Sequence, residues 1–217
     1  MKDSIDSRIC VSISEPTVEL CVNALRGLKL AEIRLDKTKL DEKNIRKVFS
    51  TQVRLVATFR PGMTDDKLRL KSLISAINHG ASFVDIELEA DDRYRGELLK
   101  AARKKGCKVI VSYHNDDRTP SREELIRIVD SCFRSGGDIA KIACKVNSTN
   151  DNARLLGLLD ENKDLVVVGM GKEGTITRVV STLLGSPFTY ASLSLGKETA
   201  LGQISAAKLK RLIGSFP

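Results

Sequence analysis

The amino-acid sequence predicts a (β/α)8 fold, in which eight parallel strands close into a barrel surrounded by helices. Eight short apolar segments of strand type recur at intervals of about 22 to 31 residues along the chain. Amphipathic segments of helical type lie between them. Because strands that alternate with helices form parallel sheets, eight such units in 217 residues favour a single TIM barrel near its minimum size.

The predicted strands are short runs of apolar and β-branched residues, each followed by polar or turn-forming residues. In chain order they are Arg8–Ser14, Leu30–Asp36, Arg54–Arg60, Phe83–Leu88, Lys108–His114, Ile139–Val146, Leu165–Gly171 and Phe188–Leu193.

The predicted helices have apolar residues at helical spacing. They include Thr17–Leu28, Asp65–Asn78, Arg93–Lys104, Ser121–Phe133, Asn152–Leu159 and Ile176–Leu184, and Gln203–Ile213 closes the chain as the eighth helix. Ser121 and Glu124 have the spacing of a capping box, and Gly185 stands where a helix C-terminus favours glycine. These start and stop signals agree with the apolar pattern.

An open, doubly wound sheet is the alternative parallel architecture. It usually has a glycine-rich first turn, whereas the first turn here, residues 12–16 (SISEP), contains no glycine. Neither a linker nor a shift in composition divides the chain. We therefore expect residues 1–217 to form one barrel domain.

The net charge of +8 arises from 36 lysines and arginines against 28 aspartates and glutamates. Basic residues are interspersed with acidic ones, and aromatic residues make up 4% of the chain. No basic segment therefore has the interleaved aromatics that stack on bases. We expect no nucleic-acid partner, but a basic surface that attracts small anions.

The five cysteines are scattered and odd in number, and they lack CxxC spacing. This pattern is typical of reduced core cysteines and not of a disulfide framework or a zinc site. The first residues include no apolar signal segment, and no apolar run approaches the length of a membrane span. We expect a cytoplasmic protein that does not contact membranes.

Unusual polar residues gather at the C-terminal ends of the predicted strands, where barrel enzymes have their active sites. In chain order they are Glu32, Arg34, Asp36, Arg60, Asp85, Glu87, His114 and Lys141, followed by the loops Met170–Lys172 and Gly196–Gln203. Charges inside a barrel are costly unless they are paired or functional. Their convergence from several strands favours a polar site over one structural ion pair.

Lys141 lies in the apolar run Asp138–Val146 (DIAKIACKV). Burial disfavours the charged form of an ammonium group and makes the amine a nucleophile, as Schiff-base enzymes require. Alternatively, Lys141 lies at the strand edge and extends its amine to water. Lys145 has the same strand parity, and the periodicity alone does not separate the two lysines.

His114 ends the strand next to that of Lys141, where it could serve as a general acid and base. Asp85 on the preceding strand either orients this imidazole or is an inward carboxylate paired with an arginine. The other histidine, His79, stands beside Gly80 at the end of a helix, where we predict a capping role without chemistry.

Residues Gly169–Arg178 (GMGKEGTITR) form a glycine-rich turn that opens a helix. Taken alone, it resembles a phosphate-binding turn at a helix N-terminus, although it lacks a Walker pattern. Arg178, near the start of that helix, could equally hold a carboxylate.

Seven motifs in this order resemble type I 3-dehydroquinate dehydratase, the Schiff-base enzyme of the shikimate pathway. They are EIRLD (Glu32–Asp36), TFR (Thr58–Arg60), FVDIEL (Phe83–Leu88), VSYHN (Val111–Asn115), AKIA (Ala140–Ala143), GMGKEGTITR (Gly169–Arg178) and GQIS (Gly202–Ser205). No one motif is decisive, but the ordered set spans almost the whole chain and is very specific.

The resemblance implies that 3-dehydroquinate is dehydrated to 3-dehydroshikimate without a metal or a cofactor, in the pathway to aromatic amino acids. The family pattern selects Lys141, and not Lys145, as the imine-forming lysine. His114 would be the general acid and base of a syn elimination. Asp85 matches the carboxylate near the histidine. A homodimer is implied by the family alone.

The resemblance also assigns the remaining substrate contacts. Substrate hydroxyls and the polar end of the site would be bound by Glu32, Arg34 and Arg60. The substrate carboxylate would be held by Arg178 and Gln203, and Met170 would contact the ring.

Two segments depart from the family pattern. Many members have Ser-Ala-Pro-Gly-Gln where this chain has Thr199–Gln203 (TALGQ), so that Thr199 would supply the hydroxyl and the loop lacks its proline. After Arg60, many members have a glutamate in a glycine-rich turn, whereas residues 61–66 read PGMTDD. We assign the role of that glutamate to neither Asp65 nor Asp66.

Two other functions remain as alternatives. A class I aldolase would share the barrel and the lysine but would cleave a C–C bond of a sugar phosphate. A non-catalytic barrel that binds phosphate or nucleic acid would use the GMGKEG turn and the positive charge, and its binding would weaken steeply with salt.

Overall fold

The structure, a computed structural model, describes residues 4–62, 65–160 and 164–216. The strands in this part of the chain are β1 (Ile9–Ile13), β2 (Leu30–Arg34), β3 (Arg54–Thr58), β4 (Phe83–Glu87), β5 (Lys108–Asn115), β6 (Ile139–Lys145), β7 (Leu165–Met170) and β8 (Thr189–Ser192). Each is apolar in sequence and largely buried, as a strand covered on both faces must be.

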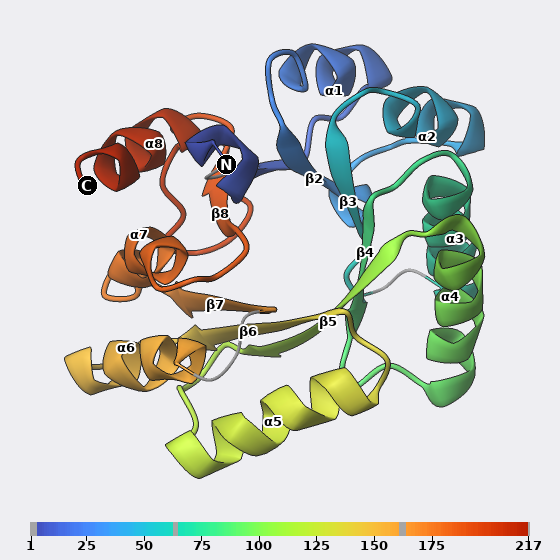
Figure 1. The fold of residues 1–217 in the computed structure, drawn as a ribbon. Helices are drawn as coiled ribbons and strands as arrows, with labels where there is room; N and C mark the ends of the chain where they lie inside the picture. Colours follow the sequence, from blue (N-terminus) through green and yellow to red (C-terminus); the bar gives the residue numbers. More distant parts are fainter. Residues whose placement is uncertain (1–3, 63–64, 161–163, 217) are drawn as a thin grey trace.

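All eight strands are parallel and form one sheet in the order β7-β6-β5-β4-β3-β2-β1-β8. Because β1 pairs with both β2 and β8, the sheet curls round on itself, and β7 contacts β8 at the seam. Figure 1 shows the helices around the outside of this nearly closed barrel. The predicted (β/α)8 fold is confirmed.

The helices follow the strands in regular alternation. They are α1 (Val18–Ala24), α2 (Glu42–Phe49), α3 (Asp66–Asn78), α4 (Asp92–Lys105), α5 (Arg122–Arg134), α6 (Thr149–Leu156), α7 (Thr175–Leu183) and α8 (Ala206–Gly214). The predicted capping box at Ser121 and Glu124 is present, and His79 is the C-cap of α3. Gly185, just beyond α7, has a φ of 105°. A positive φ favours glycine after a helix C-terminus, which is where the sequence places Gly185.

The sequence prediction missed helix α2. This helix has only eight residues, and its apolar side chains Ile45, Val48 and Phe49 are few among charged ones. Asp41 caps it by accepting a hydrogen bond from the Asn44 amide at 2.8 Å. The three apolar side chains stand at i, i+3 and i+4 and form one buried face, so the helical pattern was present in the sequence but was overlooked among the charged residues.

Asp36 also departs from the prediction, which placed it on the second strand. β2 ends at Arg34, and Asp36 lies in a short 3₁₀ helix, Leu35–Lys37. Arg34 donates to both carboxylate oxygens of Asp36, at 3.0 and 2.6 Å. This ion pair lies at the rim where the strand leaves the sheet.

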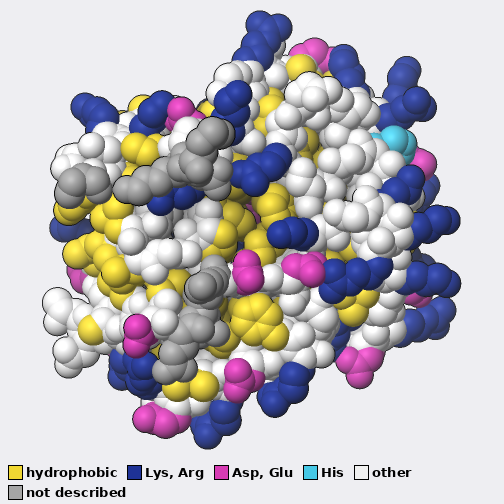
Figure 2. Space-filling view, in the orientation of Figure 1, with side chains coloured by type: hydrophobic (Ala, Val, Ile, Leu, Met, Phe, Trp, Pro, Cys, Tyr) yellow, Lys and Arg dark blue, Asp and Glu magenta, His cyan; other side chains and the backbone are white. Residues whose placement is uncertain are grey.

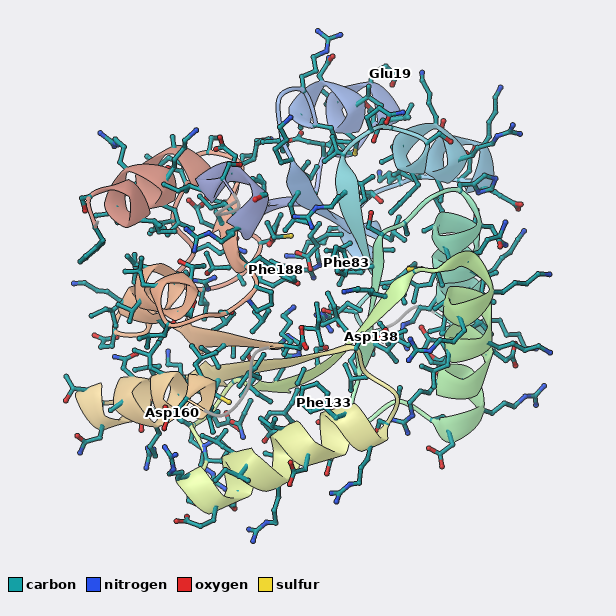
Figure 3. All side chains as sticks on the ribbon, in the orientation of Figure 1. Glu19, Phe83, Phe133, Asp138, Asp160 and Phe188 are labelled. Carbon is teal, nitrogen blue, oxygen red and sulfur yellow. The ribbon has the colours of Figure 1, made fainter. Side chains whose placement is uncertain are left out.

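Two apolar clusters form the core, one between sheet and helices and a smaller one inside the barrel. Phe83 and Phe188, labelled within the ring of strands in Figure 3, belong to the inner cluster, and their ring centroids lie 5.9 Å apart. Tyr190 follows Phe188 by two residues and therefore points to the same face. The inner cluster fills the barrel beneath the polar residues at its C-terminal end.

Lys and Arg side chains project from many parts of the face in Figure 2, with acidic side chains among them. The positive charge is thus dispersed over this face, as the sequence pattern predicts. Among the described residues, no helix is long and apolar enough to cross a membrane.

Candidate active site

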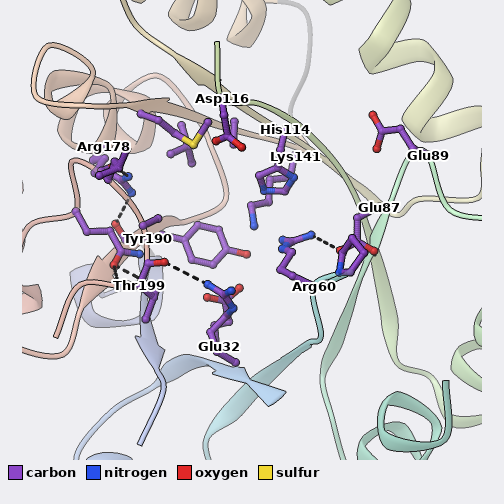
Figure 4. Close-up of a pocket in the computed structure, with 18 residues that line it drawn as sticks. Glu32, Arg60, Glu87, Glu89, His114, Asp116, Lys141, Arg178, Tyr190 and Thr199 are labelled. Carbon is purple, nitrogen blue, oxygen red and sulfur yellow. Dashed lines mark hydrogen bonds and ion pairs between the residues drawn. The ribbon is translucent and has the colours of Figure 1, made fainter. Parts of the chain in front are cut away.

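A cavity of about 530 Å³ opens at the C-terminal ends of the barrel strands (Figure 4). The structure brings nine of the predicted site residues together in its lining: Glu32, Arg34, Arg60, His114, Lys141, Met170, Arg178, Thr199 and Gln203. The tenth, Asp85, is only 1% exposed and contacts two of the lining residues from β4. We refer to this space as the active-site cavity.

Lys141 lies on the inner face of β6 and is 6% exposed, so its amine does not extend to bulk water. Its Nζ donates to Asp85 Oδ2 at 3.1 Å and lies 4.3 Å from the centroid of the Tyr190 ring. Lys145 is the last residue of β6, partly exposed and outside the cavity lining described here.

Asp85 accepts hydrogen bonds from three side chains and none of them is the imidazole of His114. Its donors within the described chain are Arg60 at 2.8 Å, Ser112 at 2.6 Å and Lys141 at 3.1 Å. Burial raises the pKa of this carboxyl, but Arg60 and Lys141 outweigh it, so that the pKa lies well below its usual range. Of the two interpretations of Asp85, the paired carboxylate matches this geometry and the histidine orienter does not.

Arg60 bridges two acidic residues of β4. Its guanidinium donates to Asp85 and, at 2.8 Å, to Glu87, and it also donates to the Ser112 hydroxyl at 2.9 Å. Arg69 of α3 donates to the other oxygen of Glu87 at 3.1 Å. The positive charge of Arg60 is therefore largely balanced before any ligand binds.

His114 extends into the cavity from β5, two residues beyond Ser112, which is the register partner of Lys141. Its side chain therefore lies on the same face of the sheet as Lys141, nearer the cavity mouth. Burial lowers the pKa of His114 well below its ordinary value of 6.5, and Arg60 and Lys141 lower it further. The imidazole is thus neutral at neutral pH and able to accept a proton.

Glu32 is held at the base of the cavity by two hydroxyls. Its carboxylate accepts from Ser12 at 2.8 Å and from Thr58 at 2.9 Å. The Gln203 amide donates to the Ser12 hydroxyl at 3.3 Å and accepts from the Thr199 backbone amide at 2.8 Å. These bonds connect the loop before α8 to the barrel.

Arg34 connects the same loop to β2. Besides its ion pair with Asp36, its guanidinium donates to the Thr199 carbonyl at 3.3 Å, and Lys37 donates to that oxygen at 3.2 Å. The loop that carries Thr199 and Gln203 therefore has fixed contacts on two sides of the cavity.

Arg178 of α7 is 1% exposed, and its side chain hydrogen-bonds to backbone carbonyls. It donates to Gly202 at 3.0 Å, Tyr190 at 3.2 Å and Leu201 at 3.2 Å, and among the described residues it forms no ion pair. Burial lowers the pKa of Arg178 to about 10. A buried cation without an acidic partner in a cavity wall favours an anionic ligand.

Two glycines of GMGKEG, Gly169 and Gly174, allow close packing of the backbone. A side chain on Gly174 would place its Cβ 2.4 Å from the Gly169 carbonyl carbon, and one on Gly169 would lie 2.9 Å from the Gly174 Cα. The Thr177 hydroxyl accepts from the Gly169 amide at 2.8 Å. These contacts pack the start of α7 against the end of β7.

Sequence reasoning missed three polar residues that line the cavity: Glu89, Asp116 and Tyr190. Glu87, which the sequence places with Asp85 among the polar residues at the strand ends but without a role of its own, also lines the cavity. A parity signal was available for Tyr190, through its spacing from Phe188. Nothing local in the sequence places the exposed Glu89 and Asp116 at the cavity mouth.

The assembled groups can perform carbonyl chemistry on a small anion. A buried primary amine forms an imine with a ketone, and a neutral imidazole beside it moves a proton at the adjacent carbon. The Arg178 guanidinium can bind a carboxylate in the same cavity. Within the described residues, no group of three or more His, Cys, Asp and Glu side chains has an arrangement that could hold a metal ion.

Comparison with known proteins gives a consistent result. The chain is 35% identical to the 3-dehydroquinate dehydratase of Methanococcus vannielii, over 94% of this chain and 98% of that protein. The crystal structure of the 3-dehydroquinate dehydratase of Aquifex aeolicus superposes with a TM-score of 0.83 at 27% identity, over 96% of this chain and 98% of that one. The aldolase QR15 has a TM-score of 0.57 at 16% identity and shares the fold alone.

The motifs that carry the predicted resemblance lie throughout the strands and loops around the cavity. The model of the type I 3-dehydroquinase family matches residues 9–216, which include every predicted site residue. With this match and the similarity to the archaeal relative along nearly the whole chain, the protein belongs to the type I 3-dehydroquinase family.

Proposed function

We propose that this protein converts 3-dehydroquinate to 3-dehydroshikimate and water through an imine on Lys141. The observation that carries the proposal is the buried Lys141 amine beside a cavity that also contains a neutral imidazole and an unpaired buried guanidinium. Family membership supports the dehydratase reaction and its place in the shikimate pathway.

The substrate is oriented by its carboxylate. Arg178 binds this group, because it is the buried cation without an acidic partner, whereas Arg60 is already balanced by Asp85 and Glu87. Gln203 supports the carboxylate from the loop. The substrate hydroxyls are bound by Glu32, Arg34, Arg60 and Thr199, and Met170 packs against the ring.

The reaction begins when the Lys141 amine attacks the C3 carbonyl to form a carbinolamine. The carbinolamine takes up one proton and loses water to give an iminium ion, which withdraws electrons from C2 and makes its proton removable. The neutral imidazole of His114 takes the C2 proton, leaving an enamine. His114 then returns the proton to the C1 hydroxyl, which departs as water on the same face. Hydrolysis of the conjugated iminium consumes one water, releases the enone product and one proton, and restores the Lys141 amine.

Asp85 supports the nitrogen of the imine in this scheme. Its carboxylate is 3.1 Å from Nζ and remains ionised because its pKa is lowered, so it balances the positive charge of the iminium. Its role is therefore directed at Lys141 and not at His114.

An ultraviolet assay for the conjugated enone product tests the function. We expect wild-type protein to form the product from 3-dehydroquinate, Lys141→Ala to be inactive, and His114→Ala to lose about 10²- to 10⁴-fold in kcat. Lys145→Ala is the matched control, because it removes the lysine of equal strand parity outside the cavity lining. Full turnover by Lys141→Ala, or retro-aldol cleavage of a sugar phosphate without dehydration, would refute the proposal.

A homodimer is the proposed assembly. Besides the family resemblance, it is supported by exposed apolar side chains on α7, on α8 and just after it: Ile176, Leu183, Leu184, Leu212 and Phe216. Light scattering coupled to size-exclusion chromatography tests it, and a mass near 23.8 kDa at micromolar concentration would contradict it.

The proposed location is the cytoplasm. All five cysteines are buried free thiols, as expected for a chain kept in a reducing compartment. Fractionation of the source cells tests this proposal, and recovery with the membrane or the medium would contradict it.

A further inference from the structure

Tyr190 contacts the nitrogen on which the imine forms, although its residue type suggests no part in the chemistry. It is the second residue of β8 and is 3% exposed. Its ring reaches across the inside of the barrel to Lys141 of β6, so that Nζ lies 4.3 Å from the ring centroid. In Figure 4 the ring extends into the cavity toward the space between Lys141 and Arg60.

The ring of Tyr190 is held from below by two further aromatic side chains. Phe188 meets Tyr190 edge-on, with centroids 5.6 Å apart and an interplanar angle of 72°. Phe83 of β4 lies 5.9 Å from Phe188 and is tilted by 59°. These three rings form an aromatic column inside the barrel that ends at the Lys141 amine, and each contact has the geometry that aromatic pairs prefer.

The hydroxyl group of Tyr190 takes no part in this support. It is buried, and no described residue forms a hydrogen bond with it. A buried hydroxyl without a partner contributes no stabilisation. The contact with Lys141 is made by the ring, so the ring and the hydroxyl can be tested separately.

Two contacts of Nζ restrict how a substrate can reach it. Asp85 Oδ2 bounds the amine at 3.1 Å, and the Tyr190 ring covers another side of it. Lys141 also lines the cavity that His114 lines. A carbonyl carbon that bonds to Nζ must therefore approach from the cavity side.

We propose that Tyr190 is a positioning residue for the imine, whose ring closes one side of the Lys141 amine and so fixes which face of the substrate is presented to His114. This inference rests on the proposed function. It adds that the same ring determines which of the two C2 hydrogens is removed, because rotation of the imine about the lysine side chain is blocked.

Three substitutions separate the ring from its hydroxyl and from general packing. Tyr190→Phe keeps the ring, and we expect kcat to stay within about twofold of wild type. Tyr190→Leu removes the ring, and we expect kcat to fall about ten- to a hundredfold while KM changes less than about threefold, since the substrate carboxylate remains bound by Arg178. Phe49→Leu removes a buried ring of the cluster between sheet and helices, outside the aromatic column, and is the control for lost packing.

The decisive measurement is the exchange of the C2 hydrogens in D₂O, followed by NMR. Wild type, Tyr190→Phe and Phe49→Leu should exchange one C2 hydrogen stereospecifically, whereas Tyr190→Leu should exchange both. Thermal unfolding identifies the variants that fold. If Tyr190→Leu does not fold, Tyr190→Met replaces it, because methionine fills more of the space without a ring.

Two results would overturn the inference. In one, Tyr190→Leu or Tyr190→Met retains wild-type turnover and stereospecific exchange. In the other, Tyr190→Phe is as impaired as Tyr190→Leu, which would assign the role to the hydroxyl. If wild-type protein forms no enone product, the proposed function itself fails, and that outcome is distinct from both.

Discussion

At the scale of single residues, the role of each arginine depends on whether neighbouring carboxylates already neutralise its charge. Arg60 and Arg178 are both arginines in the cavity wall, yet Arg60 faces two carboxylates and Arg178 faces three carbonyls. Only Arg178 has a positive charge that a ligand can still neutralise. This difference, and not residue type, assigns it to the substrate carboxylate.

Replacement of Arg178 by lysine tests that assignment. Lysine keeps the charge but loses the planar fork that binds a carboxylate through two hydrogen bonds. We expect kcat/KM for 3-dehydroquinate to fall at least tenfold, mainly through KM, in steady-state assays. Arg46→Lys on the exposed side of α2 should leave both constants unchanged. An unaltered KM in Arg178→Lys would contradict the assignment.

The pH dependence of kcat/KM follows from His114. The neutral imidazole is the active base, and its pKa lies well below 6.5 in the folded protein. As pH falls, the ring becomes protonated only below 6.5, and activity is lost there. We therefore expect wild-type kcat/KM to decline on the acid side with a midpoint below 6.5, and His114→Ala to lack this decline. A midpoint at or above 6.5 in wild type would show that His114 is not the neutral base.

Sequence reasoning reached the catalytic residues only in part. Strand parity places the side chains of Lys141 and Lys145 on the same face of the sheet and does not separate them. The family resemblance selects Lys141 as the imine-forming lysine. In the structure, Lys141 is opposite Ser112 and buried, whereas Lys145 is opposite Met170 at the strand end. The role of Asp85 could not be read from the sequence, because it depends on which of several nearby cations reaches its oxygens.

At the scale of elements, close backbone contacts hold the loops around the cavity. Gly202, with a φ of 75°, lies so close to Gly171 that a Cβ would meet the Gly171 carbonyl oxygen at 2.2 Å. The Gly171 amide in turn donates to the Leu201 carbonyl. The loop before α8 is thereby fixed to the loop before α7, which brings Gln203 and Arg178 to the same cavity.

Substitution of Gly174 tests the contact between β7 and α7. In Gly174→Ala the new Cβ would overlap the Gly169 backbone, so we expect unfolding free energy to fall by at least about 1–3 kcal/mol in urea titrations. Gly96→Ala is the control, because Gly96 lies within α4 with open space around its Cβ. There we expect a gain of roughly 0.5–1 kcal/mol. A neutral Gly174→Ala would contradict the packing role of this glycine.

Strands and longer helices were predictable because each carries its own periodic signal. The eight strands all overlap their predicted ranges, and α3, α4 and α5 agree within one residue at each end. α2 also carries such a signal, an Asp41 cap followed by apolar residues at i, i+3 and i+4, but these three residues were overlooked among the charged ones. The seam of the barrel, between β7 and β8, depends on pairings that no local pattern specifies.

At the scale of the whole molecule, the net charge of +8 bears on how substrate arrives. The charge is dispersed, so it attracts small anions generally and does not form a nucleic-acid site (Figure 2). We expect kcat/KM for the anionic substrate to fall as ionic strength rises through ~0.1 M, where charges are screened beyond about 10 Å, while kcat stays constant. Stopped-flow and steady-state assays in sodium chloride test this, and an increase in kcat/KM would contradict it.

The central claim is that the imine forms on Lys141, and borohydride reduction tests it most directly. Protein incubated with 3-dehydroquinate and reduced should gain one covalent adduct, and peptide mass spectrometry should locate it on Lys141. Lys145→Ala should be labelled as wild type, and Lys141→Ala should not be labelled. An adduct on Lys145 or any other lysine, with Lys141 unmodified, would contradict the account.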